Sequence, residues 1–136
     1  MNNKDLIELL GSVTVISFSV AMLNFFLKFI NKKYINKLGE DKKQIVILYR
    51  KIMIPFIKLH KVAGTIAVVS VLTHFYIAFS SGRVSITGLI AALLMITIFA
   101  LGFYGAFINK NYKDKWLKVH RILAFCLIVA IGIHIL

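Results

Sequence analysis

Four long apolar segments alternate with short polar ones along the chain. They cover residues 6–30, 56–80, 84–108 and 116–136. Each is at least as long as the roughly 20 residues that a helix needs to cross about 30 Å of hydrocarbon. Because lipid offers no hydrogen-bond partner to the backbone, each segment is predicted to form a helix. The pattern therefore predicts an all-α fold, a single integral membrane four-helix bundle over residues 1–136.

The composition supports a membrane protein and argues against a nucleic-acid-binding one. Hydrophobic residues make up 60% of the chain, whereas they make up about half of a soluble domain. The formal net charge is +12, and such a balance is typical of proteins that bind nucleic acid or anionic lipid. Here the charges lie between the apolar segments, so we expect the lipid bilayer to be the partner. The single cysteine, Cys126, lies within the last apolar segment and cannot form an intrachain disulfide.

Basic residues are distributed very unequally between the two sides of the predicted bundle. Residues 28–61 hold ten Lys and Arg side chains, residues 109–121 hold five, and the other side has only Lys4 and Arg83. Loops rich in Lys and Arg stay in the cytoplasm. We therefore expect both basic segments to be cytoplasmic and both termini to lie on the outer side of a multi-pass protein of the cytoplasmic membrane.

The basic segment between the first two predicted membrane helices has a helical pattern of its own. Apolar residues recur at helical spacing over residues 45–52, with Arg50 and Lys51 beside them. This spacing is typical of an amphipathic helix that lies on the inner leaflet. Pro55 follows, and we expect it at the start of the next membrane helix, where proline costs little.

All four histidines lie in two of the predicted membrane helices. His60 and His74 are in the second, His120 and His134 are in the fourth, and the members of each pair are 14 residues apart. Fourteen residues make four turns in a left-handed bundle and rise about 21 Å, so both histidines of a pair point to the same side at different depths. The two helices run parallel, because one complete helix separates them. His60 and His120 are therefore predicted at the inner level, and His74 and His134 at the outer level.

Two facing pairs of imidazoles at two depths are the arrangement that ligates two stacked haems. We therefore predict two b-type haems, with iron bound by His60 and His120 in one and by His74 and His134 in the other. Ligation by two imidazoles leaves no open position on the iron, which favours electron transfer. Intramembrane histidines also mark proton relays, and imidazole binds zinc and copper. A single metal needs ligands that converge on one point, whereas the two levels lie some 20 Å apart.

Small residues lie four positions from each histidine on the inward side, where a porphyrin needs space. They are Gly64 and Ser70 in the second helix and Ala124 and Ala130 in the fourth. Small residues also line ordinary helix interfaces. Lys61 and Arg121 directly follow the two inner histidines, so these cations either pair with haem propionates or belong to the basic belt at the membrane surface.

The stretches LHKVAGTIAVVSVLTHFYIAF (59–79) and WLKVHRILAFCLIVAIGIHIL (116–136) resemble the haem-bearing helices of di-haem transmembrane cytochromes b. The resemblance is to the ferric reductase-like transmembrane family, which is related to NADPH oxidases. It implies that the four histidines are axial ligands, with one haem toward each leaflet. The family usually adds a cytoplasmic flavin and nicotinamide domain. This chain has no Gly-rich dinucleotide loop, so the resemblance implies that a separate donor protein or a quinol supplies the electrons.

These patterns predict transmembrane electron transfer from a cytoplasmic or quinol donor to an outer acceptor, such as ferric iron or a redox protein. The chain would then be the electron-transfer component of an oxidoreductase, with ferric reductase-like activity only beside a partner. A second interpretation is a cytochrome b anchor subunit that exchanges electrons with quinone for a partner dehydrogenase or reductase. A third is a haem-free small transporter or interaction protein whose histidines bind protons or a metal. The oligomeric state stays open.

Overall fold

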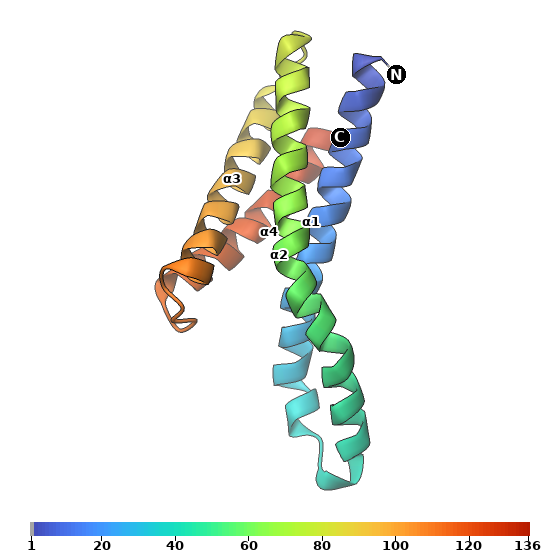
Figure 1. The fold of residues 1–136 in the computed structure, drawn as a ribbon, viewed down its shortest axis with the longest axis vertical. Helices are drawn as coiled ribbons and strands as arrows, with labels where there is room; N and C mark the ends of the chain where they lie inside the picture. The colour runs from blue at the N-terminus through green and yellow to red at the C-terminus, as the bar shows by residue number, and fades with distance from the viewer. Residues whose placement is uncertain (1) are drawn as a thin grey trace. The chain divides into compact units, whose positions relative to one another are not determined.

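The computed structural model describes residues 2–136, and the regular secondary structure within that range is entirely helical. Figure 1 shows four α-helices in chain order from blue to red: α1 (Asn3–Lys33), α2 (Lys43–Ser80), α3 (Ile86–Phe107) and α4 (Lys115–Ile135). All four are long and apolar enough to cross a membrane. The prediction of an all-α chain with four candidate membrane helices is thus confirmed.

Helix α2 is much longer than the apolar pattern predicts. It begins at Lys43 and continues through Pro55 to Ser80. The prediction that Pro55 opens this helix is therefore wrong, and residues 45–52 belong to the first turns of α2 instead of forming a separate surface helix. A proline inside a helix removes one backbone hydrogen bond and costs about 3 kcal/mol. The turns before it are held against α1, because the Tyr49 hydroxyl donates a hydrogen bond to the Leu27 carbonyl at 2.9 Å.

The chain packs as two compact units, which are described separately. Unit 1 comprises the described residues up to Thr14 together with Val68–Leu136. Unit 2 comprises Val15–Ala67. Helices α1 and α2 contribute to both units, whereas α3 and α4 lie wholly in unit 1.

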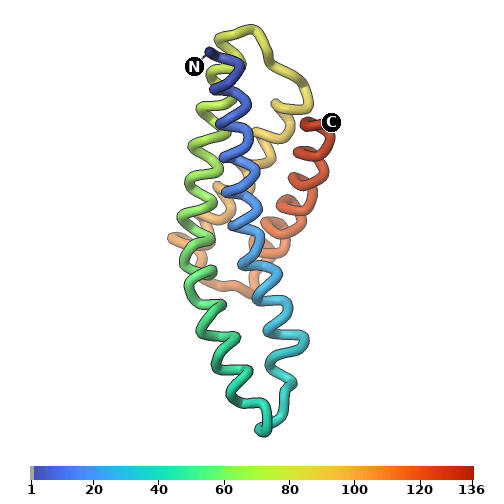
Figure 2. The backbone as a smooth tube through the Cα atoms, turned by 90° about the vertical axis from the view of Figure 1, so that its right-hand side faces the viewer, coloured from blue at the N-terminus to red at the C-terminus, as the bar shows by residue number. Residues whose placement is uncertain are grey.

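In unit 1, α3 and α4 form an antiparallel hairpin, seen in yellow to red in Figures 1 and 2. Helix α3 begins after Ser85, whose hydroxyl accepts a hydrogen bond from the Gly88 amide at 3.1 Å and so caps the first turn. At the other end of the hairpin, Gly105 leaves room for the indole of Trp116, which a side chain at residue 105 would overlap. The buried residues of the hairpin are mostly small or flexible, which lets the helices approach closely: Ala91, Ala92, Met95, Ile98, Gly105, Ala124 and Leu127.

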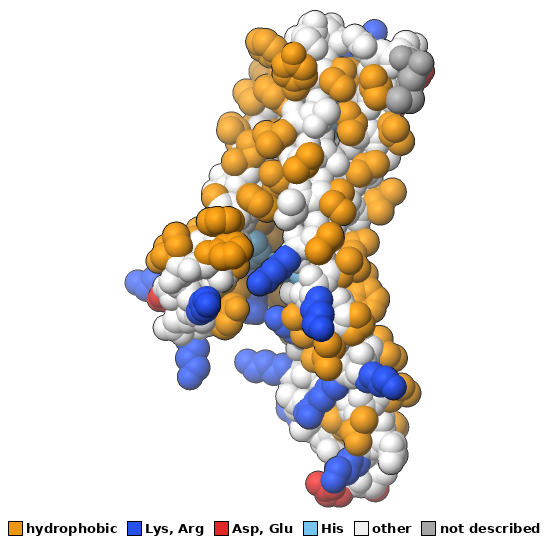
Figure 3. Space-filling model, viewed as in Figure 1, with side chains coloured by type: hydrophobic (Ala, Val, Ile, Leu, Met, Phe, Trp, Pro, Cys, Tyr) orange, Lys and Arg blue, Asp and Glu red, His pale blue; other side chains and the backbone are white. Residues whose placement is uncertain are grey.

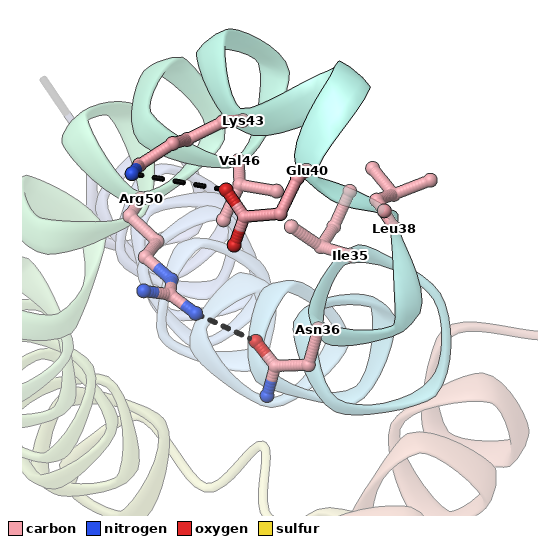
Figure 4. Close-up of a pocket in the computed structure, with 8 residues that line it drawn as sticks. Ile35, Asn36, Leu38, Glu40, Lys43, Val46 and Arg50 are labelled. Carbon is pink, nitrogen blue, oxygen red and sulfur yellow. Dashed lines mark hydrogen bonds and ion pairs between the residues drawn. The ribbon is translucent and has the colours of Figure 1, made fainter.

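Unit 2 is a hairpin of α1 and α2 joined by two short 3-10 helices, Ile35–Lys37 and Glu40–Lys42 (Figure 2). Figure 4 shows the polar contacts that close this connection. Arg50 Nη2 donates to Asn36 Oδ1 at 3.0 Å, and Lys43 Nζ lies 3.8 Å from Glu40 Oε2. Both Lys43 and Glu40 are largely exposed, so their ion pair contributes little to stability.

The surface carries apolar side chains along the helices and basic side chains at their connections. Figure 3 shows Lys and Arg gathered over the start of α2 and over the connection between α3 and α4. Large apolar side chains are exposed along all four helices, among them Ile16, Val69, Leu93 and Val129. Extended apolar surface of this kind is typical of proteins that contact a membrane.

Candidate functional site

His74 of α2 and His134 of α4 face each other within unit 1. Their ring centroids lie 6.4 Å apart and the ring planes are perpendicular, at 90°. Two imidazoles that bind one metal from opposite sides, each through a bond of about 2.0 Å, have centroids roughly 6.2 Å apart, since each centroid lies about 1.1 Å behind its nitrogen. The observed separation is close to this value. That a haem iron lies between the two rings stays a prediction from the sequence.

A backbone carbonyl of the neighbouring helix orients the ring of His74. Its Nδ1 lies 2.9 Å from the Ile7 carbonyl oxygen on α1. One turn further along α1 is Gly11, where a Cβ would lie 3.4 Å from Cε1 of His74. The ring thus lies beside Gly11, at a distance that is an ordinary van der Waals contact for a Cβ atom.

His120 of α4 repeats this arrangement against α3. Its Nδ1 lies 3.0 Å from the Ile98 carbonyl oxygen, and a Cβ on Gly102 would lie 3.3 Å from its Cε1. In both cases the acceptor and the glycine are four residues apart on a helix that has no histidine. In two distant parts of the sequence, a backbone carbonyl of a neighbouring helix therefore orients an imidazole in the same way.

In unit 2, the ring of His60 is oriented in the same way, since its Nδ1 lies 2.9 Å from the Ala21 carbonyl oxygen on α1. The residue four positions after this acceptor is Phe25 instead of glycine. The two acceptors on α1, Ile7 and Ala21, are 14 residues apart, as are His74 and His60. This match follows from the antiparallel direction of α1 and α2.

His134 departs from the pattern of the other three histidines. The α3–α4 register that pairs His120 with Ile98 places residue 84 opposite His134, but the backbone is still extended at Ser85 and α3 begins only at Ile86. His134 Nδ1 instead lies 3.1 Å from Thr87 Oγ1 and 3.2 Å from Ser85 Oγ. Two hydroxyl groups thus stand where a helix carbonyl would be.

These contacts fix the chemistry of the ring nitrogens. A carbonyl oxygen only accepts hydrogen bonds, so Nδ1 of His60, His74 and His120 carries the proton, and the lone pair lies on Nε2. Metal-bound histidines in proteins almost always donate their second ring nitrogen to a carbonyl, carboxylate or water in this manner. Such a hydrogen bond fixes the ring orientation and makes the imidazole a better ligand.

The helix faces that carry the histidines point into the protein at their midpoints. Ala67 lies seven residues from both His60 and His74, and Leu127 lies seven residues from both His120 and His134. Ala67 is 1% exposed and Leu127 is 0% exposed. Because residues seven apart share a helix face, the half-buried His60, His74 and His120 lie toward the buried sides of their helices, whereas His134 is exposed.

The small residues predicted to line the porphyrins lie at sites of differing burial. Ser70 and Ala124 are buried, Gly64 and Ala130 are half-buried, and a Cβ on Gly64 would meet no described atom within 4 Å. The two basic candidates, Lys61 and Arg121, are exposed. His60 and His120 belong to different units, so their pairing stays a prediction from the sequence, as does the role of these six neighbours.

The sequence interpretation missed the residues that orient the ligands. Gly88 and Gly102 on α3 are 14 residues apart, the same spacing as His120 and His134, and this match is the signal that identifies them. Backbone acceptors such as Ile7 leave no signal in side-chain type.

No family model, curated protein or solved structure matches the chain.

Proposed function

We propose that this chain binds two b-type haems, each between two histidines, and conducts electrons across a membrane. The observation that carries the proposal is the facing pair of His74 and His134, with ring centroids 6.4 Å apart. His74 and His134 would hold the haem through their imidazoles, and the haem would supply one-electron redox chemistry at that position. The chain's own contribution is to hold the imidazoles in place.

The proposal of a second haem is supported by a hydrogen bond that recurs at the other two histidines. His60 and His120 each have Nδ1 bonded to a helix carbonyl at 2.9 Å and 3.0 Å, respectively. Each lies 14 residues, about 21 Å along the helix, from a member of the facing pair. Two carriers at two depths are needed because neither one alone spans about 30 Å of hydrocarbon.

The direction of transfer is proposed from charge. The basic segments at residues 28–61 and 109–121 place His60 and His120 at the cytoplasmic side by the positive-inside rule. Electrons would then enter from a cytoplasmic donor protein or a membrane quinol and leave near His74 and His134 to an acceptor outside the cytoplasmic membrane.

The cofactor is tested by measuring haem per chain in protein purified from cells supplied with a haem precursor. We expect two haems per chain, sharp b-type bands in the reduced-minus-oxidised spectrum, and about one haem in His74→Ala or His134→Ala. Cys126→Ser is the matched control, because this thiol is exposed on the same helix as two of the histidines. Colourless wild-type protein, or full haem content in every single histidine variant, contradicts the proposal.

Transfer across the bilayer is tested in vesicles that contain the protein and an internal reductant, with ferricyanide outside. We expect faster reduction of ferricyanide than in protein-free vesicles, and loss of that difference in His74→Ala. Haem-containing vesicles with no activity above the protein-free rate would favour the quinone-linked anchor instead. Restoration of turnover by added quinol would support that second interpretation.

A further inference from the structure

The hydrogen bond to His134 differs in kind from those to the other three histidines. His60, His74 and His120 each meet a helix carbonyl at 2.9–3.0 Å. His134 meets the hydroxyl groups of Thr87 at 3.1 Å and Ser85 at 3.2 Å. The difference follows from the position at which α3 begins. The α3–α4 register would place the carbonyl of residue 84 opposite His134, but this residue precedes the helix.

The two hydroxyl groups form a small network that can accept a hydrogen bond from His134 when this histidine binds iron through Nε2. Nδ1 of His134 then carries a proton and donates it to a hydroxyl oxygen. Ser85 Oγ already accepts from the Gly88 amide at 3.1 Å and lies 3.3 Å from Thr87 Oγ1. Thr87 can donate to Ser85 Oγ, which has a second lone pair, and the nearer Thr87 oxygen then accepts from the imidazole.

We propose that Thr87, supported by Ser85, is a positioning residue that sets the reduction potential of the haem held by His74 and His134. This inference rests on the proposed function. An acceptor on Nδ1–H pushes electron density toward the metal and favours its higher oxidation state. A hydroxyl group that donates to Ser85 is a stronger acceptor for the imidazole N–H. Its removal leaves the Nδ1–H without its nearest partner, so the ferric form loses stabilisation.

The exposed position of His134 adds to the influence of the Thr87 hydrogen bond on this histidine. His134 is exposed, whereas His60, His74 and His120 are half-buried. A side chain held by two hydroxyls at the first turn of a helix is held less rigidly than one held by a carbonyl in the middle of a helix, because helix ends fray. The Ser85–Thr87 pair thus controls both the orientation of His134 and its electron donation.

The experiment is redox titration of the purified di-haem protein, followed by its visible spectrum. The haem of the facing pair is assigned as the one lost in His74→Ala. We expect Thr87→Val, which keeps the side-chain shape, to shift the potential of that haem to a more positive value and to leave the other haem unchanged. Thr87→Ser restores the hydroxyl and should return the potential toward the wild-type value.

Matched controls separate this effect from a general disturbance of α3. Thr97 lies on the same helix and its hydroxyl bonds the Leu93 carbonyl of α3 itself, so Thr97→Val should shift neither potential. If Thr87→Val does not fold, Ser85→Gly removes the second hydroxyl while it keeps a residue that is tolerated at a helix N-cap. It should shift the same haem in the same direction.

The outcomes distinguish this inference from the proposed function. Wild-type protein without haem rejects both. Two bound haems with potentials that are unchanged in Thr87→Val and Ser85→Gly reject only the role of the hydroxyls. A positive shift or selective loss of the assigned haem in Thr87→Val, with recovery in Thr87→Ser, supports it.

Discussion

A Cβ on Gly88 of α3 would lie 2.8 Å from Cε1 of His134 on α4, closer than two carbon atoms approach without displacement. The same relationship, at 3.3 Å, joins Gly102 to His120. Helix α3 contains no histidine, yet its glycines determine where two imidazoles can lie. The glycines therefore belong to the candidate site as much as the histidines do.

We expect Gly88→Ala to reduce haem bound at His74 and His134, because the added methyl group displaces the ring of His134. Gly102→Ala should have a smaller effect at His120, since the contact is longer. Haem per chain measures both. Gly132→Ala is the control, because a Cβ there meets no described atom within 4 Å. Full haem content and an unchanged spectrum in Gly88→Ala would show that the ring has room to move.

The ring planes of His74 and His134 are perpendicular, at 90°. In a ferric haem, perpendicular axial imidazoles give a strongly anisotropic low-spin electron paramagnetic resonance signal, and parallel ones give a rhombic signal. We expect the anisotropic type from the haem of this pair and its disappearance in His74→Ala. Two rhombic signals in the wild-type protein would contradict the ring geometry.

Leu127 is fully buried midway between the two histidines of α4. We expect Leu127→Ala to lower the free energy of unfolding by about 2–5 kcal/mol, because it leaves a cavity in a packed region. Val129→Ala is the matched control, since Val129 is 62% exposed. Unfolding in detergent, followed by circular dichroism, measures both changes. Equal losses in the two variants would place Leu127 outside the packed core.

Trp116, the single tryptophan of the chain, packs against Gly105, and its Nε1 donates to the Asn111 carbonyl at 3.2 Å. We expect Gly105→Ala to displace the indole, which shifts the emission maximum and increases quenching by iodide in haem-free protein. Gly132→Ala again provides the control. Unchanged emission and quenching in Gly105→Ala would mean that the indole does not rest on residue 105.

The sequence was sufficient to predict the four helices, because their length and apolar composition are properties of the sequence itself. It was not sufficient to predict that α2 continues through Pro55. The turns before the proline pack against α1, where Tyr49 bonds the Leu27 carbonyl, and such a contact between helices leaves no signal in the hydropathy of the sequence. The predicted start of this segment, at residue 56, is the point where the sequence becomes apolar. The helix itself begins earlier, at Lys43, because a helix can extend into polar sequence.

For the candidate site, sequence spacing placed His74 and His134 on helix faces that could meet, but it could not give the orientation of the rings. Orientation depends on acceptors such as the Ile7 and Ile98 carbonyls, which every residue possesses and which only the packed structure selects. The exception at His134 depends on a difference of two residues in where α3 begins. Helix ends are the least predictable part of a helix.

The α1–α2 hairpin of unit 2 extends well beyond the contact between Ala21 and His60, since α1 continues to Lys33 and α2 starts at Lys43. The register of that contact is set where the two helices pack, and the tip of the hairpin does not take part in it. The tip is therefore free to vary in length and composition while the imidazole keeps its place. It is the part of this hairpin best suited to acquire new contacts, because such changes would leave the hydrogen bond of His60 intact.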